Sequence, residues 1–150
     1  MSKKTVEKNS QQGRTRIMIF GTFDGLHRGH LNFFKQARNL SKASFLIISI
    51  ARDKNVLKIK GKYPRLDEHQ RAKLVRKSNP ADKVVLSGIK NHLPHIVKVR
   101  PDIIALGYDQ EAYVPNLKKD LNDKGIPVKI VRLKPYKHKI YKNHLLKIKR

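Results

Sequence analysis

Two histidines separated by Arg28 and Gly29 form the most chemically distinctive pattern in the sequence. The stretch FGTFDGLHRGH, residues 20–30, places His27 and His30 soon after a short apolar run. Residues three apart lie on the same side of a helical turn, so both imidazole rings can reach one ligand group. The free N–H groups and positive dipole of a helix N-terminus favour phosphate as that group. The pattern therefore predicts a phosphate-binding site.

The residues around this pair fit the same chemistry. Gly29 has no Cβ, which leaves space for a nucleotide against the backbone. In the preceding turn, Thr22 contributes a hydroxyl and Phe23 a backbone N–H. A zinc site fits less well, because the third and fourth ligands are missing at any familiar spacing, and we predict no metal-ligating residues. The remaining alternative is a helix start that happens to carry two histidines.

A strand and a helix are predicted on either side of the pair. Residues 16–20 (RIMIF) form an apolar run that ends at Gly21, which is typical of a buried strand. Residues 30–40 predict the helix that follows. Its apolar residues fall on one helical stripe, made of Leu31, Phe34, Ala37 and Leu40.

Strands and helices continue to alternate along the chain. Four more apolar runs predict buried strands at residues 44–51, 83–86, 102–107 and 128–133. Helices are predicted over residues 67–78, 95–100 and 115–124, and residues 52–66 are predicted to be a basic loop. Asp67 and Gln70 form the pattern of a capping box. Strands that are apolar throughout are buried on both faces, so the sequence predicts the α/β class with a Rossmann-like, doubly wound, five-stranded parallel sheet.

Length and composition limit the remaining possibilities. The 150 residues predict one domain, residues 15–150, preceded by a flexible basic tail over residues 1–14. The sequence has no cysteine, which excludes disulfides and is compatible with the cytoplasm. It has no apolar run long enough to span a membrane, so we expect no membrane partner. The net charge of +24 favours polyanions as partners, whether nucleotides or nucleic acid, and the alternative is a lysine-rich soluble surface.

The stretch GTFDGLHRGH resembles the signature of the cytidylyltransferase-like nucleotidyltransferases, in which H-x-G-H follows G-T-F-D. Residues 51–64, 68–77 and 101–110 resemble archaeal-type FAD synthases of that family in order and spacing. The resemblance covers residues 16–142 and implies the HUP-type nucleotidyltransferase fold. It also implies transfer of AMP from ATP to FMN with release of pyrophosphate, assisted by Mg²⁺ as the divalent cation. Members of the family are often homodimers, which makes a homodimer the expected assembly.

The resemblance further implies a role for each matching residue. His27 and His30 would donate hydrogen bonds to the triphosphate as charge moves to the leaving pyrophosphate. Lys60 would lie on the triphosphate or the acceptor phosphate, and Arg71 would face the same phosphates. Asp109 would contact the ribose or the base. The nucleotide-binding set implied by the resemblance is Thr22, Phe23, His27, Arg28, Gly29, His30 and Asp109.

Three of these residues have simpler explanations in the sequence itself. Lys60 lies among several lysines, so a solvated loop would also explain it. Arg71 could pair with Glu68 three residues earlier. Asp109 could cap the helix that follows it.

One departure from the family pattern leaves the substrates open. Related enzymes carry a Ser/Thr-rich stretch at the start of the last helix, where this sequence has YKNHLLK, residues 141–147. The alternative to an FAD synthase is a cytidylyltransferase, or another adenylyltransferase, that acts on a small phosphate monoester such as glycerol 3-phosphate. A third hypothesis is a nucleic-acid-binding protein on the same fold, which the charge favours and the intact histidine pair opposes.

Overall fold

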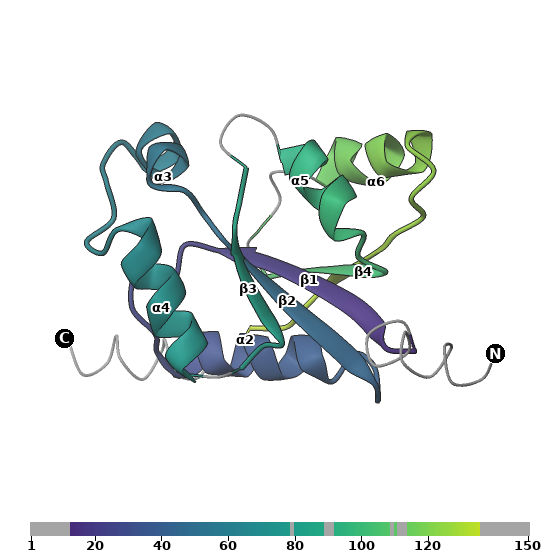
Figure 1. Cartoon of the computed structure of the whole chain (residues 1–150), viewed down its shortest axis with the longest axis horizontal. Coiled ribbons are helices and arrows are strands. Elements are labelled where there is room, and N and C mark those ends of the chain that lie inside the picture. The colour runs from purple at the N-terminus through teal and green to yellow at the C-terminus, as the bar shows by residue number, and fades with distance from the viewer. Residues whose placement is uncertain (1–12, 79, 89–91, 109, 111–113, 136–150) are drawn as a thin grey trace.

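Five strands alternate with helices along the chain, as shown by the computed structural model (Figure 1). The structure describes residues 13–78, 80–88, 92–108, 110 and 114–135. The strands are β1 (Thr15–Gly21), β2 (Ser44–Ile50), β3 (Lys83–Leu86), β4 (Ile103–Leu106) and β5 (Lys129–Arg132). The helices are α2 (Arg28–Arg38), α3 (Asp53–Lys60), α4 (Glu68–Ser78), α5 (His92–Val99) and α6 (Val114–Asp123).

The strands form one parallel sheet in the order β3-β2-β1-β4-β5. All seven residues of β1 pair with β2, from Thr15–Ser44 to Gly21–Ile50. Only two residues of β1 pair with β4, at Ile17–Ile103 and Met18–Ile104, so the two strands part beyond that point. The strand order reverses between β1 and β4, which makes this the switch point of the sheet. The predicted doubly wound α/β fold is confirmed.

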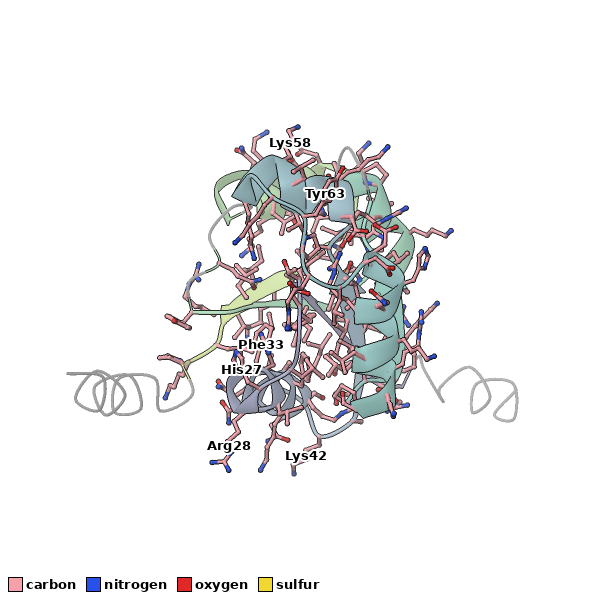
Figure 2. All side chains as sticks on the ribbon, turned by 90° about the vertical axis from the view of Figure 1, so that its left-hand side faces the viewer. His27, Arg28, Phe33, Lys42, Lys58 and Tyr63 are labelled. Carbon is pink, nitrogen blue, oxygen red and sulfur yellow. The ribbon has the colours of Figure 1, made fainter. Side chains whose placement is uncertain are left out.

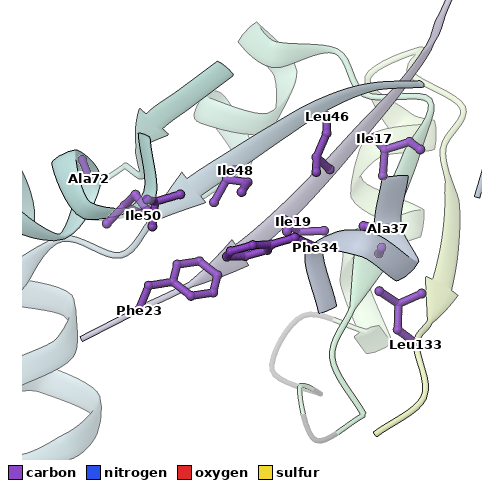
Figure 3. Close-up of a cluster of buried hydrophobic side chains, with 12 residues drawn as sticks. Ile17, Ile19, Phe23, Phe34, Ala37, Leu46, Ile48, Ile50, Ala72 and Leu133 are labelled. Atoms are coloured by element: carbon purple, nitrogen blue, oxygen red, sulfur yellow. The ribbon is translucent and has the colours of Figure 1, made fainter. Parts of the chain in front are cut away.

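Two hydrophobic clusters hold the helices against opposite faces of the sheet. Alternate residues of β1 point to opposite faces, so Ile17 and Ile19 enter one cluster while Met18 and Phe20 enter the other. The first cluster packs α2 and α4 against the sheet, through Phe34, Ala37, Ala72 and Val75 (Figure 3). The second packs α5 and α6 against the other face, through Ile96, Leu117 and Leu121. Figure 1 shows α2 on one side of the sheet and α5 and α6 on the other.

The five predicted strands and the four predicted helices are present, with ends shifted by a few residues. The capping box is confirmed: Asp67 N–H donates to Gln70 Oε1 over 2.9 Å, and Gln70 N–H donates to Asp67 Oδ1 over 2.8 Å. Arg14, which the sequence placed in the tail, donates to the Ser44 carbonyl and pairs with Asp82. Residues 1–12 and the C-terminal segment from residue 136 lie outside the described residues.

Two local predictions were wrong. Residues 53–60 form helix α3, where the sequence analysis expected only a loop. This helix buries only Val56, so its sequence shows no clear apolar stripe. Tertiary contacts, rather than an apolar face, stabilise it. Leu31, predicted on the buried stripe of α2, is 47% exposed. The helix begins at Arg28, and of the predicted stripe Phe34 and Ala37 are buried in the core, as expected.

Candidate active site

The turn between β1 and α2 is shaped by one buried aromatic side chain. Phe23 has a φ of 53°, in the left-handed region, and its side chain is almost fully buried. Its ring packs edge-to-face on Phe34 and on the His30 imidazole, with centroids 5.1 Å and 5.3 Å apart. A Cβ on Gly21 would lie only 2.3 Å from the Phe23 ring, so the ring needs a glycine there. The turn therefore anchors the start of α2 to the core.

His27 and His30 cap the helix reciprocally. His27 is the N-cap residue of α2, and its Nδ1 accepts hydrogen bonds from the backbone N–H groups of Gly29 at 3.0 Å and His30 at 3.4 Å. In return, His30 Nδ1 accepts from the His27 backbone N–H at 3.3 Å. The arrangement is a capping box built from two histidines, whereas such boxes ordinarily pair Ser or Thr with Glu or Gln.

This reciprocal cap fixes where the protons of both rings lie. A nitrogen that accepts a hydrogen bond from a backbone N–H must carry its lone pair, so in a neutral imidazole the proton is on the other nitrogen. Both Nδ1 atoms accept, and Nε2 is therefore the donor on His27 and on His30. The rings stack with centroids 3.8 Å apart and planes 22° apart, so each ring restricts the orientation of the other.

Burial reinforces the neutral state of the second ring. Burial of the His30 imidazole, together with the neighbouring His27, lowers the pKa of His30 to about 4 from its ordinary 6.5. At neutral pH, His30 is therefore an uncharged hydrogen-bond donor. His27 lies at the exposed edge of the helix start, beside the exposed Arg28.

Gly29 is required by the capping histidine. A Cβ on residue 29 would lie 2.9 Å from His27 Cε1 and 3.0 Å from its Nδ1. The first separation is shorter than real Cβ contacts and the second is tighter than most of them, so a larger residue would displace the ring. The sequence analysis expected Gly29 to leave space for a nucleotide, and the structure adds that it leaves space for His27.

Asp24 joins the same turn to the segment that follows α3. Its carboxylate accepts hydrogen bonds from the backbone N–H groups of Arg65 at 2.6 Å and Leu66 at 2.8 Å. Burial alone would raise the pKa of this carboxyl, but these hydrogen bonds and the charges of Arg65 and Arg71 outweigh it and lower the pKa. Asp24 is thus a charged structural residue at neutral pH.

Arg71 is fully buried below this turn and holds three parts of the chain together. Its guanidinium donates to the Thr22 carbonyl at 2.9 Å, to the Leu66 carbonyl at 3.0 Å and to the Asp53 carboxylate at 2.6 Å. The sequence analysis expected Arg71 to face a ligand or to pair with Glu68. Its ion pair is with Asp53 instead, and it contacts the turn after β1 through the backbone of Thr22.

Helices α3 and α4 are fastened to each other at the same place. Glu68 accepts from the Asp53 backbone N–H at 2.8 Å, and Asp53 accepts from the Glu68 backbone N–H at 3.2 Å. Glu68 also pairs with Arg52 at 3.0 Å. These contacts explain why residues 53–60 are helical, and they fix α3 relative to the turn after β1.

The remaining predicted residues lie at different places around this face of the molecule. Figure 2 shows His27 and Arg28 on one side of the face, with Lys58 and Tyr63, from α3 and the loop after it, on the other. Lys60 ends α3 and is exposed, so it belongs to the α3 side. Asp109 lies outside the described residues. The structure thus brings Thr22, Phe23, His27 and His30 together and sets Lys60 apart from them.

Residues that the sequence analysis did not single out also shape this edge of the sheet. The Gln110 side chain donates to the Phe20 carbonyl at 3.0 Å and accepts from the Gly107 N–H at 2.8 Å. Arg132 Nη1 donates to the carbonyls of Gly107 and Gln110, both at 2.8 Å. Its place as a polar residue three positions after the predicted strand over residues 102–107 was the only sequence signal for Gln110.

The acidic and histidine side chains of the described part of the chain do not gather into a metal centre. Within residues 13–78, 80–88, 92–108, 110 and 114–135, no three His, Cys, Asp or Glu side chains lie close enough to hold a metal ion. Asp24, the acidic residue nearest the histidines in sequence, already accepts two backbone hydrogen bonds. In the same described residues, no helix is long and apolar enough to cross a membrane.

Comparison with known proteins gives consistent matches over most of the chain. The sequence model of the cytidylyltransferase-like family matches residues 18–143. The chain is 43% identical over 124 residues to the FAD synthase of Korarchaeum cryptofilum, covering 82% of this chain and 83% of that protein. It is 44% identical over 119 residues to the FAD synthase of Methanosarcina barkeri, covering 79% of this chain and 83% of that protein.

A solved structure also resembles the whole fold. The crystal structure of the lipopolysaccharide core biosynthesis protein from Thermoplasma volcanium superposes with a TM-score of 0.74 at 36% sequence identity. The match covers 81% of this chain and 98% of that protein.

Proposed function

Because the chain belongs to the cytidylyltransferase-like family, we propose that it is an FAD synthase, which transfers AMP from ATP to FMN. Its relatives from Korarchaeum and Methanosarcina, named FAD synthases, match it at 43% and 44% identity over most of their length. The observation that carries the proposal is the reciprocal cap of His27 and His30, which presents two Nε2–H donors at a helix N-terminus.

The reaction needs positioning and charge stabilisation rather than a protein nucleophile. A phosphate oxygen of FMN attacks the α-phosphorus of ATP, a new P–O–P bond forms, and the bond between the α- and β-phosphates breaks to release pyrophosphate. Negative charge grows on the oxygen that leaves. Donors that are fixed before the reaction stabilise that charge without reorganising, which is how such a site lowers the barrier. The caps on both Nδ1 atoms and the stacking of the rings provide this fixed geometry.

The other predicted residues divide into ligand contacts and supports. We propose that Arg28, exposed at the first position of α2, and Lys60, exposed at the end of α3, contact phosphate groups from opposite sides. The N-terminus of α2 adds its dipole. Arg71 acts through Thr22, because its guanidinium is buried and bound to backbone and to Asp53. It is therefore a positioning residue for the turn.

Mg²⁺ enters this proposal as part of the nucleotide substrate. A resident metal does not fit the described residues, which offer no cluster of three ligands. The triphosphate of ATP binds the cation with its own oxygens, and such sites commonly use substrate phosphates in place of a protein cage. The basic residues of this face then neutralise the negative charge of the triphosphate that the cation does not balance.

Pyrophosphate release by the purified chain tests the proposed reaction. ATP and CTP are each combined with FMN, glycerol 3-phosphate and phosphopantetheine in the presence of Mg²⁺, and the double variant His27→Ala/His30→Ala serves as the control. We expect release with ATP and FMN, and none above background in the double variant. Release with CTP, or with another acceptor alone, would contradict the FAD synthase proposal while keeping the reaction class.

A further inference from the structure

We propose that Gln110 is a positioning residue that sets the width of the nucleotide crevice at the switch point between β1 and β4. In open α/β sheets, ligands bind in the crevice outside the carboxyl ends of the strands where the strand order reverses. Here that point lies beside β1, whose end leads directly into the turn of the two histidines. The inference rests on the proposed function only in taking a nucleotide as the ligand.

The two strands separate where the crevice begins. Their pairing ends at Met18 and Ile104, although β1 continues to Gly21 and β4 to Leu106. Beyond these pairs, the described residues of β1 and β4 have no further strand pairing that would hold one backbone to the other. A side chain that bridges them would therefore decide how far apart they stand.

The Gln110 amide forms this bridge. Its Nε2 donates to the Phe20 carbonyl on β1 at 3.0 Å, and its Oε1 accepts from the Gly107 N–H just past β4 at 2.8 Å. The backbone N–H of Gln110 also donates to the Gly107 carbonyl at 3.1 Å, which closes a tight turn. The side chain thus contacts both strand ends by the same kind of hydrogen bond that a paired strand would make.

Arg132 holds the turn from the other side. Its Nη1 lies 2.8 Å from the carbonyls of Gly107 and Gln110 and 3.3 Å from that of Tyr108. Arg132 belongs to β5, so the turn is fixed to a strand on one flank and, through Gln110, to β1 on the other. The position of the nucleoside relative to the histidines then depends on this bridge, because Gln110 joins the strand ends on either side of the switch point.

The chain offers a matched control in Gln36. The Gln36 side chain also bridges two elements with two backbone hydrogen bonds, donating to the Lys134 carbonyl at 2.8 Å and accepting from the Lys134 N–H at 3.0 Å. It does so from the last turn of α2, whereas the two histidines lie at the start of that helix. Replacing either glutamine with methionine removes its two hydrogen bonds to backbone and keeps the length of the side chain; Gln36→Met also removes the donation from Gln36 Nε2 to Asn32 Oδ1 at 2.7 Å.

ATP binding to the full chain, measured by calorimetry without FMN, distinguishes a residue that positions the nucleotide site from one that only stabilises the fold. We expect Gln110→Met to weaken ATP binding about tenfold, as expected for the loss of one or two hydrogen bonds that order a site. Gln36→Met is expected to stay within twofold of wild type while losing similar thermal stability. Equal weakening in both variants, or wild-type affinity in Gln110→Met, would overturn the inference.

A second substitution and a kinetic measurement complete the test. If Gln110→Met does not fold, Gln110→Glu keeps the acceptor for the Gly107 N–H and replaces the donor to the Phe20 carbonyl with a carboxylate oxygen, and the same criterion applies to it. In the complete reaction, a positioning role predicts a raised KM for ATP with the KM for FMN within twofold. Equal rises in both KM values would contradict it. A chain that binds ATP but does not adenylylate FMN would refute the proposed function and leave the inference on Gln110 standing.

Discussion

Gly29→Ala tests whether the two histidines act through their reciprocal cap. A Cβ on residue 29 would lie 2.9 Å from His27 Cε1 and 3.0 Å from its Nδ1. The imidazole must move by roughly 0.6 Å to restore an ordinary carbon–carbon separation of about 3.5 Å. That movement takes Nδ1 away from the Gly29 and His30 N–H groups, which it contacts at 3.0 Å and 3.4 Å. It also carries Nε2 away from the phosphate that it is proposed to bind.

The effects of this substitution on stability nearly cancel. Loss of the side-chain cap costs about 0.5–2 kcal/mol, whereas replacing glycine with alanine in a helix gains up to about 1 kcal/mol. We therefore expect the melting temperature to change by only a few degrees. Activity is expected to fall about 10²-fold, because a misplacement on the order of 1 Å in a catalytic constellation has an effect of that size.

The assay is steady-state pyrophosphate release with ATP and FMN, beside thermal unfolding followed by circular dichroism. Gly125→Ala is the control, because Gly125 has a φ of 76° at the end of α6, on another segment of the chain. Alanine there is strained and should lower the melting temperature while leaving kcat unchanged. A value of kcat/KM for Gly29→Ala within threefold of wild type would refute the role of the cap.

Three further results are expected. Arg71→Met should lower the free energy of unfolding by roughly 3 kcal/mol in urea titrations, because it leaves Asp53 without its ion-pair partner, and a loss below about 1 kcal/mol would contradict the structural role. The pKa of His30, about 4, lies below its ordinary 6.5, so the unfolded chain takes up the proton first as pH falls. The free energy of unfolding should therefore decrease from pH 6.5 towards pH 4, and less steeply in His30→Asn; identical slopes would show that His30 is not responsible. Finally, EDTA should abolish turnover and added Mg²⁺ should restore it. Elemental analysis of the purified chain should find no stoichiometric metal. A tightly bound metal would contradict the proposal that Mg²⁺ enters the site with ATP.

The fold could be predicted because its strands carry a clear signal. A run such as Ser44–Ile50, buried at every residue, is compatible only with a strand covered on both faces. The histidine pair could also be predicted from the sequence, since its spacing and its place after β1 both indicate a helix N-terminus. Helix α3 was missed because its stability comes from Asp53 and Glu68, which cap each other across 15 residues of sequence.

The function of individual polar residues was harder to predict because it depends on burial. Arg71 carries the same charge whether it faces a phosphate or a carbonyl, and only the structure shows it buried against Thr22 and Asp53. Gln110 gave almost no signal, because its role arises from the separation of β1 and β4. The reciprocal cap could have been suspected from H-x-G-H, since N-cap and N3 residues lie three apart.

The fate of labelled ATP tests the central claim most directly. The purified protein is incubated with FMN, Mg²⁺ and ATP labelled either at the α- or at the γ-phosphate, and the products are separated by chromatography. The account predicts that the α label appears in FAD and the γ label in pyrophosphate, and that both fall to background in His27→Ala/His30→Ala. Undiminished transfer in the double variant, or ATP consumed without labelled FAD, would contradict it.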